Sequence, residues 1–366
     1  MNQETKKIIY LGAASFMAAS LASVLSALGM AFIPMLLLSV SAGVNVLVSL
    51  SAKRAGNTKF HWLFPLAAFA CALVLNPSGT FSISYGIVTL AAFAAGAVIS
   101  AQIDREKSKV VAILSSDAVL FVMVLVAFFI GYFIEHKTLA PSAVVSSVKG
   151  FFDAIEADMA ALFKETGIYT VASGILDLSG YTEDSFIKEI AGEIILTLKI
   201  ISPSLIIFAL NAFSYLATVF YTLSCRITKT PVTKSEGKWY LIPSAASAWI
   251  LEISLVLYLV INLFSSFQAS VAVETITSVL LNLIIILAPP MFICGVRGLI
   301  GRFRSKRPGF RFSAIAIIAL AVGAAILIQG TGILYGLLFI ALQGGWDMIS
   351  FYRMKKLNER NKQNED

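Results

Sequence analysis

The chain has 366 residues, of which 58% are hydrophobic and only 13% are charged. A soluble protein of this length does not need so much apolar surface, whereas a helical membrane protein does, so the composition excludes a string of soluble domains. The net charge of +7 lies in short loops rather than on a folded polar face, which excludes a nucleic-acid-binding surface.

Residues with catalytic or metal-binding chemistry are few. The three cysteines fall inside or at the edge of apolar stretches, so no disulfide framework is expected. The two histidines, His61 and His136, are not spaced from these cysteines as metal ligands would be, and they do not form a nucleophile–base pair with them. We therefore expect no metal, no cofactor and no enzymatic activity. The apolar run from Ile8, although it follows Lys6 and Lys7, is too long for a signal peptide and predicts an uncleaved first span.

The apolar stretches predict a polytopic transmembrane bundle of the all-α class. A helix needs about 20 apolar residues to cross about 30 Å of hydrocarbon. Tight connections near residues 27–34 and 329–332 leave eight or nine crossings as alternatives to ten. The ten predicted spans are 8–28, 33–51, 62–77, 82–103, 109–133, 203–224, 240–264, 274–296, 312–329 and 332–351.

The basic residues predict the orientation of these spans. Every second gap between spans is rich in Lys and Arg, and these gaps, with both ends of the chain, hold 23 of the 28 basic residues. Because cytoplasmic loops retain Lys and Arg, both termini are predicted to be cytoplasmic in a bacterial cytoplasmic (inner) membrane. The other five basic residues share one long outer segment with ten acidic residues.

That outer segment, residues 135–202, divides the chain. It separates an N-terminal five-span half (1–134) from a C-terminal five-span half (203–352), which a polar cytoplasmic tail (353–366) follows. Within it, Pro141 can open an amphipathic helix that stops near Gly167, and Thr182 can cap a second one. Two such extracytoplasmic helices would either lie on the lipid surface or cap the outer mouth of the bundle.

Three acidic residues fall inside predicted spans. Glu252 lies near the bilayer midplane, where an ionised carboxylate is costly, so it is either a substrate or proton site or a protonated structural residue. Asp117 and Asp347 lie closer to the membrane edge, where an anchoring ion pair competes with a functional role.

Polar side chains also recur in two of the spans. Asn211, Tyr215 and Thr218 follow each other at helical spacing, so they share a face that either lines a cavity or bonds to a neighbouring helix. Asn282 precedes the pair Pro289–Pro290, which removes two backbone donors and either kinks the helix or breaks it to build a binding site. With Glu252, these four polar residues form the predicted substrate-binding set.

A family resemblance rests on residues of the C-terminal half. Pro203 precedes a span that runs through Asn211 to Arg226, Trp239 and Pro243 open the next, and the last ends in Gly344-Gly345-Trp346-Asp347. This pattern resembles the YybS-like family of bacterial multi-spanning membrane proteins, whose function is unknown, although the Pro289–Pro290 pair departs from it. The family is distantly similar to the substrate-binding subunits of energy-coupling-factor transporters, and it implies no catalytic residues.

These patterns favour small-molecule transport or substrate binding in the membrane. The predicted partners are the lipid bilayer, a small-molecule substrate and a protein partner or energising subunit, with no nucleic acid. The alternative is a non-transporting scaffold or regulatory membrane protein that binds a partner through its outer helices. An intramembrane enzyme is a weaker reading because paired catalytic groups are missing.

Overall fold

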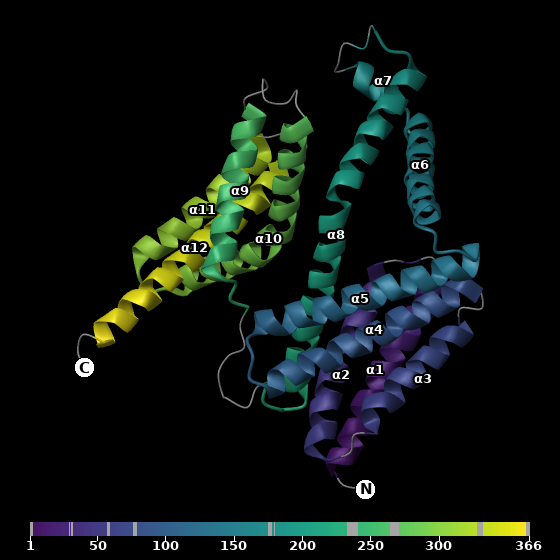
Figure 1. Cartoon of the computed structure of the whole chain (residues 1–366). Helices are drawn as coiled ribbons and strands as arrows, with labels where there is room; N and C mark the ends of the chain where they lie inside the picture. The colour runs from purple at the N-terminus through teal and green to yellow at the C-terminus, as the bar shows by residue number, and fades with distance from the viewer. Residues whose placement is uncertain are drawn as a thin grey trace. The chain divides into compact units, whose positions relative to one another are not determined.

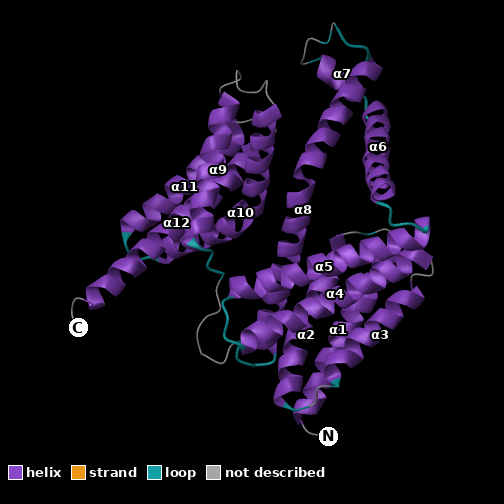
Figure 2. Ribbon diagram, viewed as in Figure 1, coloured by secondary structure: helices purple, strands orange, loops and turns teal. Residues whose placement is uncertain are grey.

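Every regular element in the described part of the chain is an α-helix (Figures 1 and 2). The structure is a computed structural model that describes residues 3–28, 30, 32–56, 59–75, 79–174, 178, 180–232, 241–263, 271–327 and 332–363. The helices there are α1 (Gln3–Ala27), α2 (Phe32–Arg54), α3 (Phe60–Leu75), α4 (Gly79–Asp104), α5 (Lys109–His136), α6 (Pro141–Glu165), α7 (Ile168–Ser173), α8 (Glu183–Ile227), α9 (Ala245–Leu263), α10 (Val271–Arg304), α11 (Pro308–Leu327) and α12 (Gly332–Gln363).

Each of the ten apolar stretches overlaps a described helix, and the described residues confirm the all-α class. Among the described residues, α1, α2, α4, α5, α8, α10 and α12 are long and apolar enough to cross a membrane. The apolar parts of α3, α9 and α11 are shorter. Phe121, Leu125, Phe129 and Phe133 recur every four residues of α5 and are all exposed, as expected for a helix that contacts lipid.

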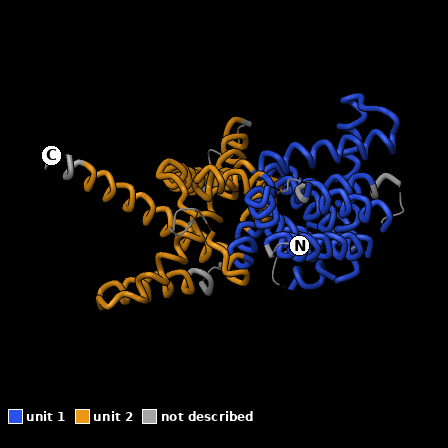
Figure 3. The backbone as a smooth tube through the Cα atoms, turned by 90° about the horizontal axis from the view of Figure 1, so that it is seen from below, with its two compact units in different colours: residues 1–97, 116–203, 216–224 blue, residues 98–115, 204–215, 225–366 orange. Residues whose placement is uncertain are grey.

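The helices form two compact units (Figure 3). Unit 1 consists of residues 1–97, 116–203 and 216–224, and unit 2 of residues 98–115, 204–215 and 225–366. Three helices, α4, α5 and α8, contribute segments to both units. The predicted separation of two five-span halves by residues 135–202 stays a prediction.

Helix α2 forms the core of unit 1. Its residues 41–52 are all buried, and small or polar side chains let neighbouring helices approach closely. The Ser15 hydroxyl of α1 donates a 2.9 Å hydrogen bond to the carbonyl of Ser41. One turn further along α2, the Asn45 amide donates a 3.1 Å hydrogen bond to the carbonyl of Phe93 in α4. These bonds satisfy polar groups that would otherwise be costly in a buried, apolar setting.

Helices α6 and α7 and the first half of α8 form a helical hairpin in unit 1. As the sequence predicts, α6 begins at Pro141, and Gly167, with a φ of 64°, follows its end. The N terminus of α8 is capped reciprocally, since the Thr182 hydroxyl accepts from the amide of Ser185 and the Ser185 hydroxyl accepts from the amide of Thr182.

An ion pair links the two long helices of this hairpin. Lys164 of α6 donates a 2.9 Å hydrogen bond to Asp184 of α8, and this contact raises the pKa of Lys164. Both side chains are exposed, so the pair adds little stability.

The apolar stripe of α6 is only partly covered. No α6 residue is fully buried, although Phe152 lies beneath Lys199 of α8, whose ammonium nitrogen is 5.5 Å from the ring centre. The large apolar side chains of α6 that stay exposed are Val145, Val148, Phe151 and Leu162. Described protein residues therefore leave this part of the apolar surface of α6 uncovered.

Helix α8 continues through Pro203, where the sequence predicts a boundary. Proline has no amide hydrogen, so the carbonyl of Lys199, four residues earlier, loses its helical donor. The hydroxyl of Ser202 supplies a substitute, a 3.0 Å hydrogen bond to that same carbonyl. The helix therefore runs unbroken for 45 residues, or about 68 Å, well beyond what a bilayer core requires.

Helices α9, α10, α11 and α12 pack together in unit 2. Ala248 and Leu251 of α9, Ile284 and Met291 of α10 and Ala341 of α12 share one apolar cluster. Glycines bring α10 and α12 into close backbone contact.

Two of these glycines lie where a side chain would collide with the facing helix. A Cβ at Gly295 would meet the carbonyl of Ile340, and a Cβ at Gly344 would meet the carbonyl of Met291. Such close approach increases the packing contacts that hold membrane helices together.

Candidate functional site

A hollow in unit 2, called the unit 2 pocket here, brings distant segments of the sequence together. Its volume of about 170 Å³ is below the roughly 300–1,000 Å³ of typical ligand pockets, so it fits a small ligand or one end of a larger one. It is lined by the start of α5, the middle of α8, the residue Leu241 and the middle of α10. The lining residues are Ile113, Phe208, Asn211, Ala212, Tyr215, Leu241, Ile286, Pro289, Pro290 and Ile293.

Two of the sequence-predicted site residues line this pocket from α8. Asn211 and Tyr215 are four residues apart, so they lie on the same face, one turn apart. The Asn211 amide nitrogen donates a 2.9 Å hydrogen bond to the carbonyl of Ile207. This bond fixes the side-chain amide while its carbonyl oxygen keeps the capacity to accept from a ligand.

The proline pair forms part of the opposite wall. Helix α10 runs through Pro289 and Pro290 without a break, so the pair does not split the helix. Because neither proline can donate, the carbonyls of Ile285 and Ile286 lack their usual helical partners. Ile286 itself lines the pocket. The α10 wall therefore combines an apolar surface with backbone acceptor capacity.

Two basic residues stand beside the pocket. The ammonium nitrogen of Lys109 lies 5.1 Å from the ring centre of Tyr215, a cation–π contact, and Lys109 is only 5% exposed. Arg297 of α10 donates a 3.3 Å hydrogen bond to the carbonyl of Leu241. Both cations thus contact residues that line the pocket.

Glu252 lies elsewhere in unit 2, on the α9 face that meets α12. Its carboxylate oxygen Oε1 lies 3.1 Å from the position that a Cβ on Gly345 would take. This oxygen is buried and has no hydrogen-bond partner among the described residues. Glu252 belongs to the same predicted site set as Asn211, Tyr215 and Asn282 of unit 2, but its Oε1 forms no hydrogen bond with any of these three residues.

The two other predicted site residues, Asn282 and Thr218, form hydrogen bonds with helix backbone groups and do not line the pocket. Asn282 of α10 accepts a 3.2 Å hydrogen bond from the amide of Ser204 in α8 and donates a 2.8 Å bond to the carbonyl of Ser278. Thr218 is buried in unit 1, and its carbonyl accepts a 2.8 Å bond from Thr222. Of the polar residues predicted to share one face of α8, Asn211 and Tyr215 therefore line the unit 2 pocket, whereas Thr218 is buried in unit 1.

The two acidic residues near the membrane edge differ in setting. Asp347 of α12 forms an ion pair with Arg302 of α10 and accepts a 3.0 Å hydrogen bond from Gln343. This is an anchoring contact between two packed helices. Asp117 is buried in the part of α5 that belongs to unit 1.

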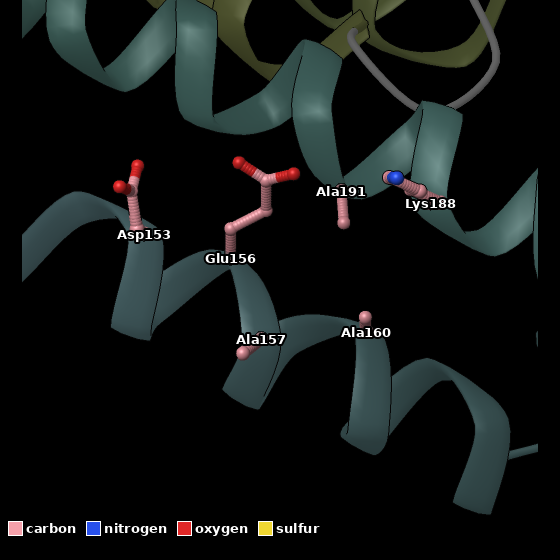
Figure 4. Close-up of a pocket in the computed structure, with 6 residues that line it drawn as sticks. All are labelled: Asp153, Glu156, Ala157, Ala160, Lys188 and Ala191. Carbon is pink, nitrogen blue, oxygen red and sulfur yellow. The ribbon is translucent and has the colours of Figure 1, made fainter. Parts of the chain in front are cut away.

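A second hollow lies between α6 and α8 in unit 1 (Figure 4). Its volume is about 360 Å³, and Asp153 and Glu156 extend from α6 toward α8, which contributes Lys188. The remaining lining residues are the alanines Ala157, Ala160 and Ala191. It is an open groove beside exposed charges, whereas the unit 2 pocket combines an anchored amide with apolar walls and has the buried Lys109 beside it. The unit 2 pocket is therefore the stronger candidate site.

The sequence singles out Asn211, Tyr215 and the proline pair, but it gives little sign of the other residues in and beside the pocket. Lys109 counts in the sequence only as one loop cation among several, and Ile113 and Leu241 are ordinary apolar residues. The sequence does show that Lys109 shares a helix face with Ile113, because it lies one turn before Ile113 at the start of a span.

Comparisons with models of protein families, with curated proteins and with solved structures find no match. The resemblance of the C-terminal half to the YybS-like family therefore stays a prediction.

Proposed function

We propose that this chain is a multi-pass protein of the bacterial cytoplasmic membrane that binds a small molecule in the unit 2 pocket, as a transport or substrate-binding protein. The observation that carries the proposal is the pocket itself. It places Asn211, Tyr215 and the proline pair around one hollow in which most of the lining is apolar. Apolar walls with a few fixed polar groups are the usual composition of small-molecule sites.

The orientation belongs to the same proposal. The distribution of 23 of the 28 basic residues supports ten crossings with both termini in the cytoplasm. The hairpin of α6, α7 and the first half of α8 would then lie outside the membrane. The start of α5 and the end of α10, with Lys109 and Arg297, would lie toward the cytoplasm.

A thermal-shift screen of the purified protein against a library of small metabolites tests this function. A ligand that binds only the folded state raises the melting temperature. Ala212→Leu adds bulk to the pocket lining, whereas Ala209→Leu places the same bulk on an exposed position of α8. We expect a ligand that stabilises the wild type and Ala209→Leu but not Ala212→Leu. Equal stabilisation of all three proteins would place the binding site elsewhere.

One observation favours a second candidate function, a scaffold or regulatory protein. The exposed part of the α6 stripe offers an apolar face on the hairpin. If that face binds a protein partner, Phe151→Asp should abolish co-purification of the partner while the melting temperature stays unchanged. A partner retained by Phe151→Asp would rule out this face as the contact.

A further inference from the structure

The C-terminal part of α12 is exposed. In unit 2, α10 and α12 are held together as far as Asp347, which pairs with Arg302. Residues 351–363, called the α12 extension here, continue past α10 and α11 (Figures 1 and 3). Every side chain from Arg353 to Glu359 is exposed. The α12 extension therefore meets whatever surrounds the protein at this end of unit 2.

One face of the α12 extension is apolar. Phe351, Met354 and Leu357 recur every three residues, so they form one stripe along the helix, and all three are exposed. Arg353 lies four residues before Leu357, and Lys355 lies four residues after Phe351, which places a cation beside each edge of the stripe. The α12 extension is thus a basic amphipathic helix, the type that binds membrane surfaces.

The turn that joins α10 to α11, with the helix ends beside it, has the same composition. Its exposed aromatic residues are Phe303, Phe310 and Phe312. Residues 302–311 hold five basic residues and no acidic residue. Because Arg302 of this segment pairs with Asp347 of α12, the turn lies at the same end of unit 2 as the α12 extension.

Spacing along α12 places the apolar stripe at the depth of lipid headgroups. The predicted span ends at Phe351, whose ring packs edge-on against that of Tyr352, and aromatic residues are typical of the membrane–water boundary. Met354 and Leu357 lie about 4.5 and 9 Å further along the helix axis, whereas the headgroup layer is about 5–8 Å thick. Helical side chains also lean toward the N terminus of their helix, which is the membrane side here. The stripe can therefore reach the acyl chains.

The charges at this end of unit 2 favour anionic lipid as the occupant. The two carboxylates of these segments, Asp347 and Glu359, already pair with basic residues. Arg304 and Lys356 are exposed and form no ion pair within the described part of the chain. An anionic lipid surface supplies both phosphates for the cations and acyl chains for the apolar stripe, in the layer where these side chains lie.

We propose that the α12 extension binds the surface of an anionic phospholipid leaflet, with Phe351, Met354 and Leu357 inserted and with Arg353 and Lys355 beside the lipid phosphates. The basic turn between α10 and α11 forms a second part of the same contact. This inference rests on the membrane location in the proposed function but not on the unit 2 pocket, so the two can fail separately.

An environment-sensitive fluorophore on the purified protein in nanodiscs tests the inference. In a cysteine-free background, the fluorophore is attached at Leu357→Cys, on the apolar stripe, or at Lys356→Cys, on the face away from it. Replacing part of the phosphatidylcholine with phosphatidylglycerol should shift the emission at position 357 to shorter wavelength. Emission at position 356 should stay that of a water-exposed fluorophore. Salt at about 1 M should reverse the shift, because the Debye length falls to about 3 Å.

Charge variants show whether the cations beside the stripe cause the shift. Arg353→Gln and Lys355→Gln should each lower the ratio of inserted to free extension about fivefold in the anionic nanodiscs. Lys149→Gln removes one charge at an exposed position of α6 and should behave like the wild type. Arg353→Lys keeps the charge and should keep the shift, which separates loss of electrostatic attraction from loss of helical structure.

Three results would overturn the proposal. An equal shift in pure phosphatidylcholine would show that the stripe inserts without recognising anionic lipid. Water-like emission at position 357 in both kinds of nanodisc would show that lipid does not cover the stripe and would point to a protein partner. A shift that both Gln variants retain in full would show that Arg353 and Lys355 do not contact the lipid phosphates.

Discussion

The carboxylate of Glu252 has an energetically unfavourable environment in unit 2. Its Oε1 is buried against α12 without a hydrogen-bond partner among the described residues. A buried polar group without a partner costs about 1–3 kcal/mol. We therefore expect Glu252→Leu to raise the melting temperature, while Glu252→Gln, which keeps a polar group there, stays close to the wild type.

Gln343 offers the matched control for Glu252. Its amide donates to Asp347, so Gln343→Leu removes a hydrogen bond that is made and should lower the melting temperature. Thermal melting in one detergent compares all four proteins. A lower melting temperature for Glu252→Leu would mean that its carboxyl group has a partner that stabilises the fold.

Lys109 illustrates what the sequence can and cannot predict about single residues. The shared face of Asn211 and Tyr215 was predictable, because polar residues on an apolar span are visible at a four-residue spacing. The contact between Lys109 and Tyr215 joins residues 106 positions apart, and only packing brings them together. Thr218 continues the same stripe but is buried in unit 1, which spacing alone does not show.

At the scale of elements, the contact between α10 and α12 depends on glycine. Gly295→Ala would push a Cβ against the carbonyl of Ile340 and force the helices apart, at a cost of about 1–3 kcal/mol. Gly301, two turns further along α10, has open space where its Cβ would be. Gly301→Ala should therefore be neutral or stabilise by about 0.5–1 kcal/mol, because alanine favours the helix. Equal effects on the melting temperature would contradict this packing.

The hairpin of α6 and α8 offers a second matched pair. Phe152 lies beneath Lys199, whereas its neighbour Phe151 is 62% exposed. Phe152→Asp should open the hairpin, so that trypsin cleaves at Lys164 and Lys188 faster than in the wild type. Phe151→Asp should leave the cleavage rate unchanged. Faster cleavage of Phe151→Asp would show that its face is covered in the folded protein.

Helix α8 shows why the element boundaries were only partly predictable. A proline between an amphipathic stretch and an apolar span is typical of a helix start, and this favours a boundary at Pro203. The hydrogen bond from Ser202 to the carbonyl of Lys199 compensates for the missing amide and lets the helix continue. The start of the same helix was predictable, because Thr182 has the side chain of an N-cap.

At the scale of the whole molecule, hydropathy predicts the helices well because each span must be apolar along its length. Each of the ten predicted spans overlaps a described helix, as expected because burying backbone groups in lipid requires helical hydrogen bonding. The division into two units was not predictable. It depends on which segments of α4, α5 and α8 pack with which neighbours, and the ends of a span do not encode that choice.

The proposed topology predicts which side of the membrane α7 and the end of α12 face. In a cysteine-free background, a single cysteine at Ser173 in α7 should react with a membrane-impermeant maleimide on intact cells. A cysteine at Lys355, exposed near the end of α12, should react only after the membrane is permeabilised. This follows from the cytoplasmic placement of most basic residues. Labelling of Lys355→Cys on intact cells would reverse the orientation.

Native mass spectrometry of the protein extracted from its membrane tests the central claim, that the unit 2 pocket holds a small molecule. The spectrum should show a bound species of defined mass on the wild type and on Ala209→Leu. The same species should be absent from Ala212→Leu, whose added side chain occupies the pocket. A bound species that persists on Ala212→Leu, or an unliganded wild type in every preparation, would contradict the account.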